Sequence, residues 1–217
     1  MRKLERLLIT GGAGFIGSAF IRWIVSQKKA LRIVNLDRLT YAGSLHNLNG
    51  LEGHSAYRFI RGDICDQVLV ERILEEESID AVINFAAETH VDRSIVSARP
   101  FFETNVMGTL SLLEAVKKFP QVHFHHVSTD EVYGSLGKSG AFNEESVYRP
   151  NSPYSASKAA SDHLVRAFTQ TYGISTTLSH CSNNYGPGQY PEKFIPLMIL
   201  NCLNHPSSRL IFEESIA

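Results

Sequence analysis

The stretch Leu7-Leu8-Ile9-Thr10-Gly11-Gly12-Ala13-Gly14-Phe15-Ile16-Gly17 determines the fold class that we predict for this chain. Its apolar first half is typical of a buried strand, and apolar residues at helical spacing follow it. Gly11, Gly14 and Gly17 have the spacing G-x-x-G-x-x-G, close to the glycine pattern of dinucleotide-binding turns. A Cβ atom there would block both the sharp turn and the approach of a pyrophosphate. We therefore predict a strand, a tight turn and a phosphate-binding helix N-terminus, with an ordinary glycine-rich loop as the alternative.

A second predicted strand supports the dinucleotide interpretation. Residues 31–36 are mostly apolar and lead into Asp37, which lies 20 residues beyond Gly17. A carboxylate at this offset binds the ribose hydroxyls of a dinucleotide. Its charge would repel the extra phosphate of NADP, so NAD is the predicted cofactor, although the neighbouring Arg38 weakens this preference.

The composition excludes several classes of protein. The chain has 217 residues, of which 43% are hydrophobic and 20% charged, and its formal net charge is −1. This near-neutral balance argues against nucleic acid or a membrane surface as the main partner. Cys65, Cys181 and Cys202 lack metal-ligand spacing, so we predict no metal site and a reducing compartment. Because no apolar run reaches ~20 residues and no signal peptide precedes the first strand, we expect a cytoplasmic protein.

Strand-like and helical patterns alternate along the chain. This order predicts an α/β fold, a doubly wound parallel sheet of the Rossmann-like type. Further strands are expected at 57–64, 81–87 and 122–127, and helices at 68–78 and 101–119. Asp63 closes the third strand, where it can reach an adenine or cap the next helix. Both roles remain open.

Four other residues, in three places, bear on the function of the first half of the chain. Small residues, Ala86 and Ala87, follow the fourth strand and would let a flat cofactor lie against the backbone. His90 is interpreted as structural, because no nucleophile or metal ligand accompanies it. Asn105 falls within an apolar helix face, where we expect a hydrogen-bonded core residue that helps to shape the pocket.

The segment Ser128-Thr129-Asp130-Glu131-Val132-Tyr133-Gly134 follows the fifth strand. Hydroxyls and two carboxylates at the carboxyl end of a parallel strand are placed where ligands bind in α/β sheets. A solvated turn or a helix cap is the alternative. The loop 135–153 is rich in Gly, Ser, Asn and Glu, and we expect a flexible segment that covers the site as a lid.

The segment Tyr154-Ser155-Ala156-Ser157-Lys158 opens a predicted helix that continues through Ala167 or beyond. Residues four apart project from one helix face, so Tyr154 and Lys158 would lie side by side. A nearby ammonium favours the phenolate and lowers the pKa of the tyrosine, which makes it a usable base. A tyrosine four residues before a lysine is common by chance. It becomes a specific signal for a catalytic pair when it follows the glycine turn and Ser128-Thr129 in the same chain.

Together these motifs resemble the extended short-chain dehydrogenase/reductases, from Leu7 to about Asn204. The resemblance rests on segments 10–17, 37–43, 86–94, 128–134, 154–158 and 181–187. The pair Asp130-Glu131 directly after Thr129 resembles the sugar-nucleotide dehydratases of this family more than its epimerases and simple reductases. The resemblance implies dTDP-glucose as the substrate, NAD as the cofactor and a homodimer formed through helices that include residues 154–158.

The resemblance also implies a division of labour among the candidate catalytic residues. Tyr154 would take the C4 hydroxyl proton as a hydride passes to NAD, assisted by Lys158 and Thr129. The resulting ketone makes the C5 proton acidic, so that Glu131 could remove it while Asp130 protonates the departing C6 hydroxyl. The hydride would then return to C6. A UDP-sugar epimerase or decarboxylase, and an inactive NAD-binding homologue, are the alternatives.

Binding residues follow from the same resemblance. The cofactor set comprises Gly11, Gly12, Gly14, Phe15, Ile16, Gly17, Asp37, Arg38, Thr40, Asp63, Ile64, Phe85, Ala86, Ala87, Thr104, Tyr154, Lys158 and Asn184. The sugar-nucleotide set comprises Thr89, Thr129, Asn183, Lys193 and Phe194. Residues 181–187 could instead form a plain Asn-Gly-Pro turn, but the match continues to Lys193 and favours binding.

Two departures from the family pattern stand out. His180 occupies a position where the family usually has Arg. Members of the family are longer than this chain, and residues 210–217 no longer follow the pattern. We therefore expect an NAD-binding domain at 1–175 and the start of an incomplete substrate lobe at 176–217.

Overall fold

The computed structural model describes residues 4–27, 31–137 and 139–204, so the departure at 210–217 lies outside the described residues. Six parallel strands form one sheet in the order β3-β2-β1-β4-β5-β6. The strands are β1 (Arg6–Thr10), β2 (Arg32–Asp37), β3 (Tyr57–Arg61), β4 (Ala81–Asn84), β5 (His123–Thr129) and β6 (Thr176–Cys181). The predicted doubly wound parallel sheet is confirmed, with its order reversing between β1 and β4.

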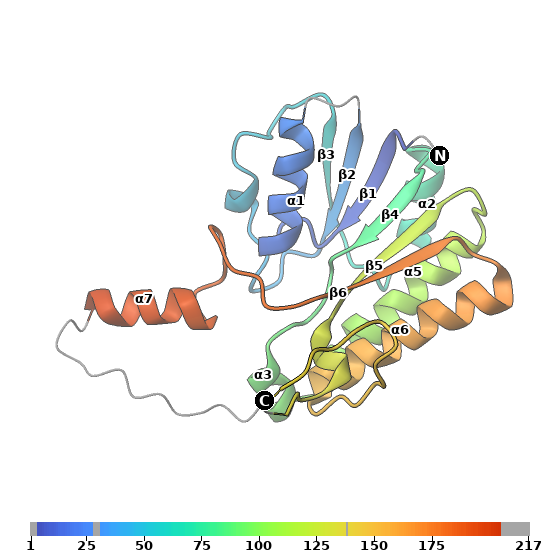
Figure 1. The fold of residues 1–217 in the computed structure, drawn as a ribbon. Helices are drawn as coiled ribbons and strands as arrows, with labels where there is room; N and C mark the ends of the chain where they lie inside the picture. Colours follow the sequence, from blue (N-terminus) through green and yellow to red (C-terminus); the bar gives the residue numbers. More distant parts are fainter. Residues whose placement is uncertain (1–3, 28–30, 138, 205–217) are drawn as a thin grey trace.

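Helices cover both faces of the sheet (Figure 1). On one face lies α1 (Phe15–Ser26), and on the other lie α2 (Gln67–Glu76), α5 (Gly108–Lys117) and α6 (Pro153–Tyr172). The remaining elements are η1 (Leu45–Leu48), α3 (Val91–Val96), α4 (Arg99–Phe101), a π-helical segment η2 (Phe102–Met107), η3 (Asp130–Tyr133) and α7 (Phe194–Asn204), which stands away from the sheet. Among the described residues, no helix combines the length and apolarity needed to cross a membrane.

Alternating residues of the central strands build two cores. Leu8 and Val34 pack with α2, α5 and α6, whereas Leu7 and Ile33 pack with α1. This period of two is the ordinary geometry of a strand buried on both faces, and it explains the continuous apolar runs in the sequence. The two cores hold the sheet rigid beneath the carboxyl ends of its strands.

Three predicted elements differ from the structure. The strand expected at 57–64 ends at Arg61, so Asp63 lies in the turn beyond it. The strand expected at 81–87 ends at Asn84, because its register with β1 ends opposite Thr10, where β1 enters the glycine turn. The helix expected at 101–119 contains the π-helical turn 102–107, and Asn105 lies within that turn. The strand β6 extends the same sheet past residue 175, and the domain boundary itself stays a prediction.

The turn after β1 needs glycine at two positions for steric reasons. Gly11 has a φ of +70°, and a Cβ atom on it would lie 2.6 Å from the backbone nitrogen of Ala86. A Cβ atom on Gly17 would lie 2.4 Å from the carbonyl oxygen of Gly11. Both neighbours are backbone atoms that cannot move aside, so the start of α1 can approach the turn only without side chains.

Replacing Gly11 with Ala is therefore expected to lower the free energy of unfolding by about 3 kcal/mol. The measurement is the denaturant midpoint of the variant against that of the unchanged protein. Gly137→Ala is the matched control, because nothing lies within 4 Å of a Cβ atom at that position. Equal midpoints for the two variants would contradict the steric account of the turn.

Candidate active site

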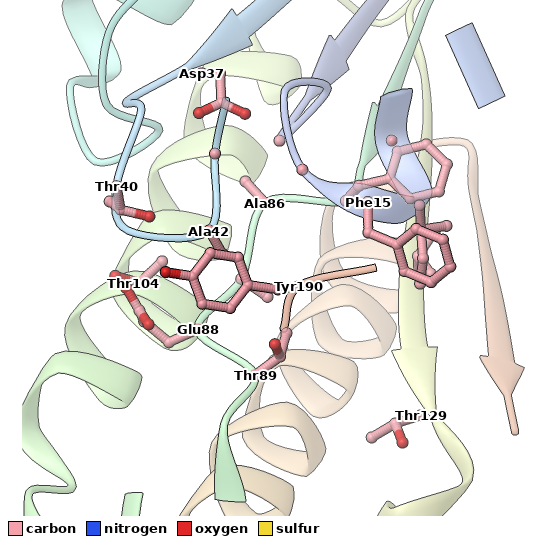
Figure 2. Close-up of a pocket in the computed structure, with 18 of the residues that line it drawn as sticks. Phe15, Asp37, Thr40, Ala42, Ala86, Glu88, Thr89, Thr104, Thr129 and Tyr190 are labelled. Atoms are coloured by element: carbon pink, nitrogen blue, oxygen red, sulfur yellow. The ribbon is translucent and has the colours of Figure 1, made fainter. Parts of the chain in front are cut away.

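A pocket lies at the carboxyl ends of the strands, where the order of the sheet reverses. Its volume is about 310 Å³, within the range of sites that enclose a small-molecule ligand. Figure 2 shows residues that approach it from the glycine turn, from the ends of β2 and β4, and from the loop that holds Tyr190. Every predicted cofactor residue except Gly12 lines this pocket.

The glycine turn forms one wall. Gly14 is the N-cap of α1 and lines the pocket, so backbone N–H groups of the helix start face it without a competing side chain. Gly12 lies behind the turn, where its N–H donates to Asn35 Oδ1 at 3.1 Å. Asn35 is fully buried in β2 and escaped our sequence analysis, although a lone amide within an apolar strand was a usable signal.

Asp37 is held in place at the end of β2. One of its carboxylate oxygens accepts the Ala13 N–H at 2.9 Å, and the other accepts the Leu39 N–H at 2.8 Å. Each oxygen keeps a further lone pair, and Asp37 lines the pocket. The geometry fits the acceptance of two neighbouring hydroxyls.

Arg38 turns away from Asp37 to a different acid. Its guanidinium lies 2.6 Å from Asp63 Oδ2 and 3.9 Å from Glu88 Oε1. Burial alone would raise the pKa of Asp63, but the Cys65 N–H and the Arg38 guanidinium hold it below its usual value. Arg38 is thus neutralised by acids on its own side of the pocket.

The helix-cap alternative for Asp63 is wrong. The N-cap of α2 is Asp66, whose side chain accepts the Leu69 N–H at 3.0 Å. Asp63 instead accepts the Cys65 N–H at 2.9 Å in a local turn and lines the pocket. An adenine-binding role for Asp63 stays a prediction.

The candidate catalytic residues gather at the end of β5 and the start of α6. Thr129, Glu131, Tyr154 and Lys158 all line the pocket, whereas Asp130 does not. Partial burial, and then the neighbouring carboxylate of Asp130, raise the pKa of Glu131. A carboxylate with a raised pKa is a stronger base, so Glu131 is suited to proton abstraction.

The expected lowering of the tyrosine pKa is wrong for this structure. Burial raises the pKa of Tyr154, and the carboxylate of Glu131 raises it further, against a weaker opposing effect from Thr129. The amine of Lys158 donates to the carbonyl oxygen of Val127 at 2.9 Å. Tyr154 is therefore a neutral phenol here, able to donate a proton or, with additional positive charge nearby, to give one up.

The predicted sugar-nucleotide residues separate into two groups. Thr89, Thr129, Asn183 and Lys193 line the pocket, and the Lys193 amine donates to the Thr89 carbonyl oxygen at 3.1 Å. Phe194 begins α7, is 61% exposed and does not line the pocket. Their roles in substrate binding stay predictions.

Asn105 is the satisfied core group that we expected. Its side-chain oxygen accepts the Glu88 N–H at 2.8 Å, and its amide donates to the Glu88 carbonyl at 3.0 Å and to Ser157 Oγ at 2.8 Å. These bonds tie the loop after β4 to α6. Asn105 thereby fixes one side of the pocket.

A cluster of aromatic and charged side chains, which no sequence motif indicated, lies at the pocket rim. The rings of Tyr41 and Tyr190 meet edge to face with centroids 5.5 Å apart, and the Arg93 guanidinium lies 3.9 Å from the Tyr41 ring centre. Arg93 also donates to Glu192 at 2.8 Å, and the His90 ring lies 3.5 Å from the same carboxylate. His90 itself caps α3, which agrees with a structural role. These contacts join distant turns, and no local spacing predicts them.

The loop 135–153 does not cover the pocket. None of its described residues lines the pocket, and Tyr148 packs instead against Tyr133 behind η3. Among the described residues, no group of three metal-ligating side chains is placed to hold a metal ion.

The fold and the pocket together define a Rossmann-like protein of the extended short-chain dehydrogenase/reductase class. A family model described as GDP-mannose 4,6 dehydratase matches residues 8–213. The chain belongs to this family.

Curated relatives and solved structures agree with the family. A dTDP-glucose 4,6-dehydratase of Xanthomonas campestris pv. campestris (strain B100) is 57% identical over 205 residues, which cover 90% of this chain and 58% of that protein. The structure of DesIV, a dTDP-glucose 4,6-dehydratase from Streptomyces venezuelae solved with NAD bound, gives a TM-score of 0.88 at 49% identity and covers 92% of this chain and 62% of that one. The UDP-glucose 4-epimerase of Thermus thermophilus, also solved with NAD, gives a TM-score of 0.79 at 32% identity, with coverages of 90% and 60%. The chain spans about three fifths of the length of the curated relatives that it matches.

Proposed function

We propose that the protein is an NAD-dependent hydro-lyase that converts dTDP-glucose to its 4-keto-6-deoxy derivative. The observation that carries this proposal is the meeting of the glycine turn, Asp37, Tyr154 and Glu131 in one pocket. Relatives with this activity, at 47–57% identity, support it.

The pocket fits NAD on its own geometry. The first residues of α1, Phe15 and Ile16, offer backbone N–H groups to a pyrophosphate, and Asp37 offers carboxylate oxygens to a ribose. Small side chains at Ala86 and Ala87 leave room along the pocket wall after β4. When bound, NAD supplies a hydride acceptor that carries a positive charge before its reduction.

The residues of this chain then have distinct tasks. Once it has ionised under the positive charges of the Lys158 ammonium and of bound NAD, Tyr154 accepts the proton of the sugar C4 hydroxyl, which Thr129 orients. Glu131 removes the proton from C5 once C4 is a ketone, and Asp130 supplies a proton to the departing C6 hydroxyl. The two adjacent carboxylates differ in position, since Glu131 lines the pocket and Asp130 lies outside its lining. Different environments are what two carboxyl groups with opposite roles require.

Incubation of the purified protein with dTDP-glucose, with and without added NAD, tests the proposal. Formation of the 4-keto-6-deoxy sugar is the expected result. Saturable NAD binding without product would favour an inactive homologue, and turnover of a UDP-sugar alone would favour an epimerase or decarboxylase. Failure to bind NAD would contradict the assignment of the pocket.

The cofactor preference gives a separate prediction. Asp37→Asn is expected to weaken NAD binding by about 10-fold, because one acceptor is lost and the remaining oxygen is neutral. The same variant is expected to bind NADP better than the unchanged protein does, since its repulsive charge is gone. Calorimetric titrations with both cofactors measure the two effects. Glu145→Gln makes the same charge change at an exposed position and should leave both affinities unchanged.

We also propose that two copies of the chain associate through α6 and its neighbours. Exposed apolar side chains, Ile95, Val96, Phe102 and Met107, lie on α3 and η2, which pack against α6. Such side chains are unusual on a surface that contacts only water. Sedimentation of the purified protein should give twice the mass of the chain.

A further inference from the structure

A buried polar cluster lies behind the Tyr154–Lys158 segment of α6. At its centre is Asp162, which is 2% exposed and stands one helical turn after Lys158. Its Oδ2 atom accepts from Ser128 Oγ at 2.8 Å and from Tyr148 Oη at 3.2 Å, and lies 3.1 Å from His180 Nε2. Strands β5 and β6 and the loop before α6 thus all supply partners for one carboxylate oxygen.

The other carboxylate oxygen of Asp162 makes no hydrogen bond of this kind within the described part of the chain. Oδ1 is buried and has no hydrogen-bond partner among the described residues. His126 Nε2 lies 3.6 Å from it. The same nitrogen lies 3.3 Å from the Lys158 amine. One histidine ring nitrogen therefore contacts both the lysine and the unpaired carboxylate oxygen.

The Lys158 ammonium needs a counter-charge at this position. The residue is buried, and this burial lowers the pKa of its amine to about 8, against an opposing attraction from the carboxylate of Asp162. A buried ammonium without a partner commonly loses its proton near neutral pH.

The titratable groups that face Lys158 come from three elements. Tyr154, on α6, has a raised pKa and is neutral. His126, on β5, has a pKa well below its usual value because of burial and the nearby Lys158 charge, so it is neutral as well. From β6, Cys181 Sγ donates to the Ser128 carbonyl at 3.2 Å. His180, also on β6, carries no negative charge in either form.

We propose that Asp162 is a positioning residue that keeps the buried Lys158 amine charged where it contacts Val127 and His126. Among the groups that face the amine, its carboxylate supplies the negative charge. Ser128, Tyr148 and His180 saturate Oδ2 and hold the side chain so that Oδ1 faces His126, whose ring nitrogen contacts the Lys158 amine. The catalytic consequence rests on the proposed function, because the charged amine would stabilise the phenolate of Tyr154.

The test is the titration of Lys158, measured without cofactor or substrate. Protein labelled with ¹³C-lysine is titrated by NMR, and the Lys158 signal is the one missing from Lys158→Met. The signal is expected to titrate near pH 8 in the unchanged protein. In Asp162→Asn it is expected to titrate at least about one pH unit lower. Asp162→Glu retains the charge and should restore most of the original value.

Two controls separate this effect from a general loss of structure. Glu145→Gln removes one exposed carboxylate elsewhere and should leave the Lys158 titration unchanged. If Asp162→Asn does not fold, Asp162→Ser provides a smaller neutral side chain for the same measurement. An unchanged Lys158 titration in a folded neutral variant would overturn the proposal. Because no turnover is measured, this outcome is independent of whether the protein is a dehydratase.

Discussion

Replacing Tyr154 with Phe is expected to lower kcat for dTDP-glucose by about 10²–10⁴-fold, the range for the loss of a positioned general base. The phenol lines the pocket near Thr129 and Glu131, and the substitution removes the oxygen that would accept the C4 hydroxyl proton there. NAD affinity should change little, because the substitution leaves the phosphate-binding turn and Asp37 intact, and Asp37 lies across the pocket from Thr129 in Figure 2. The absorbance of reduced nicotinamide should therefore fail to rise when sugar is added to the NAD-loaded variant.

Tyr172→Phe is the matched control for this prediction. Tyr172 is the last residue of the same helix, is 52% exposed and does not line the pocket. Its variant should oxidise the sugar at the unchanged rate. A Tyr154→Phe variant that oxidises the sugar as fast as Tyr172→Phe would rule out the assignment of the base.

The sequence predicted the fold well because its strongest signals are local. The strand and helix around Gly11 follow from apolar periodicity and from the steric demands of the turn, and both are confirmed. The alternation of strands and helices restricts the topology to very few arrangements, and the parallel sheet is among them. Local patterns missed the π-helical turn at 102–107, in which Asn105 donates to Ser157 of α6.

The site was predicted less completely, since electrostatics depends on burial and on distant neighbours. Spacing placed Tyr154 and Lys158 on one helix face, as the structure has them, but it gave the wrong direction for the tyrosine pKa. The reason is that burial disfavours the phenolate and Glu131 adds a negative charge near the phenol, while Lys158 directs its amine to the Val127 carbonyl. A motif records which residues occur together and carries no information on how deeply each is buried.

The same limit explains why Asp162 went unnoticed. In the sequence it is one acid on a long helix, where a solvated face is the usual interpretation. Its importance appears only when β5, β6 and residue 148 converge on it in three dimensions. His180, noted as a departure from the family pattern, has one ring nitrogen 3.1 Å from this carboxylate. The departure therefore falls on the cluster beside Lys158, at a residue that does not line the pocket.

Replacing Glu131 with Gln is expected to abolish dehydration while leaving sugar oxidation possible. The amide keeps the size of the side chain but cannot accept the C5 proton, and the loss of a positioned base again lowers the rate by about 10²–10⁴-fold. Reduced nicotinamide should therefore accumulate after sugar is added, unlike in Tyr154→Phe. Exchange of the C5 hydrogen with deuterated solvent should also be lost.

The raised pKa of Glu131 gives this prediction a pH dependence. A base works only in its ionised form, so in the unchanged protein dehydration should fall as the pH drops through the raised pKa of Glu131. That acid limb should lie at a higher pH than the ordinary carboxyl range, because burial and Asp130 both disfavour the charged form. Glu145→Gln, at an exposed position, should preserve both the rate and the acid limb. If Glu131→Gln retains solvent exchange at C5, another group abstracts the proton, and Asp130, its immediate neighbour, becomes the next residue to replace.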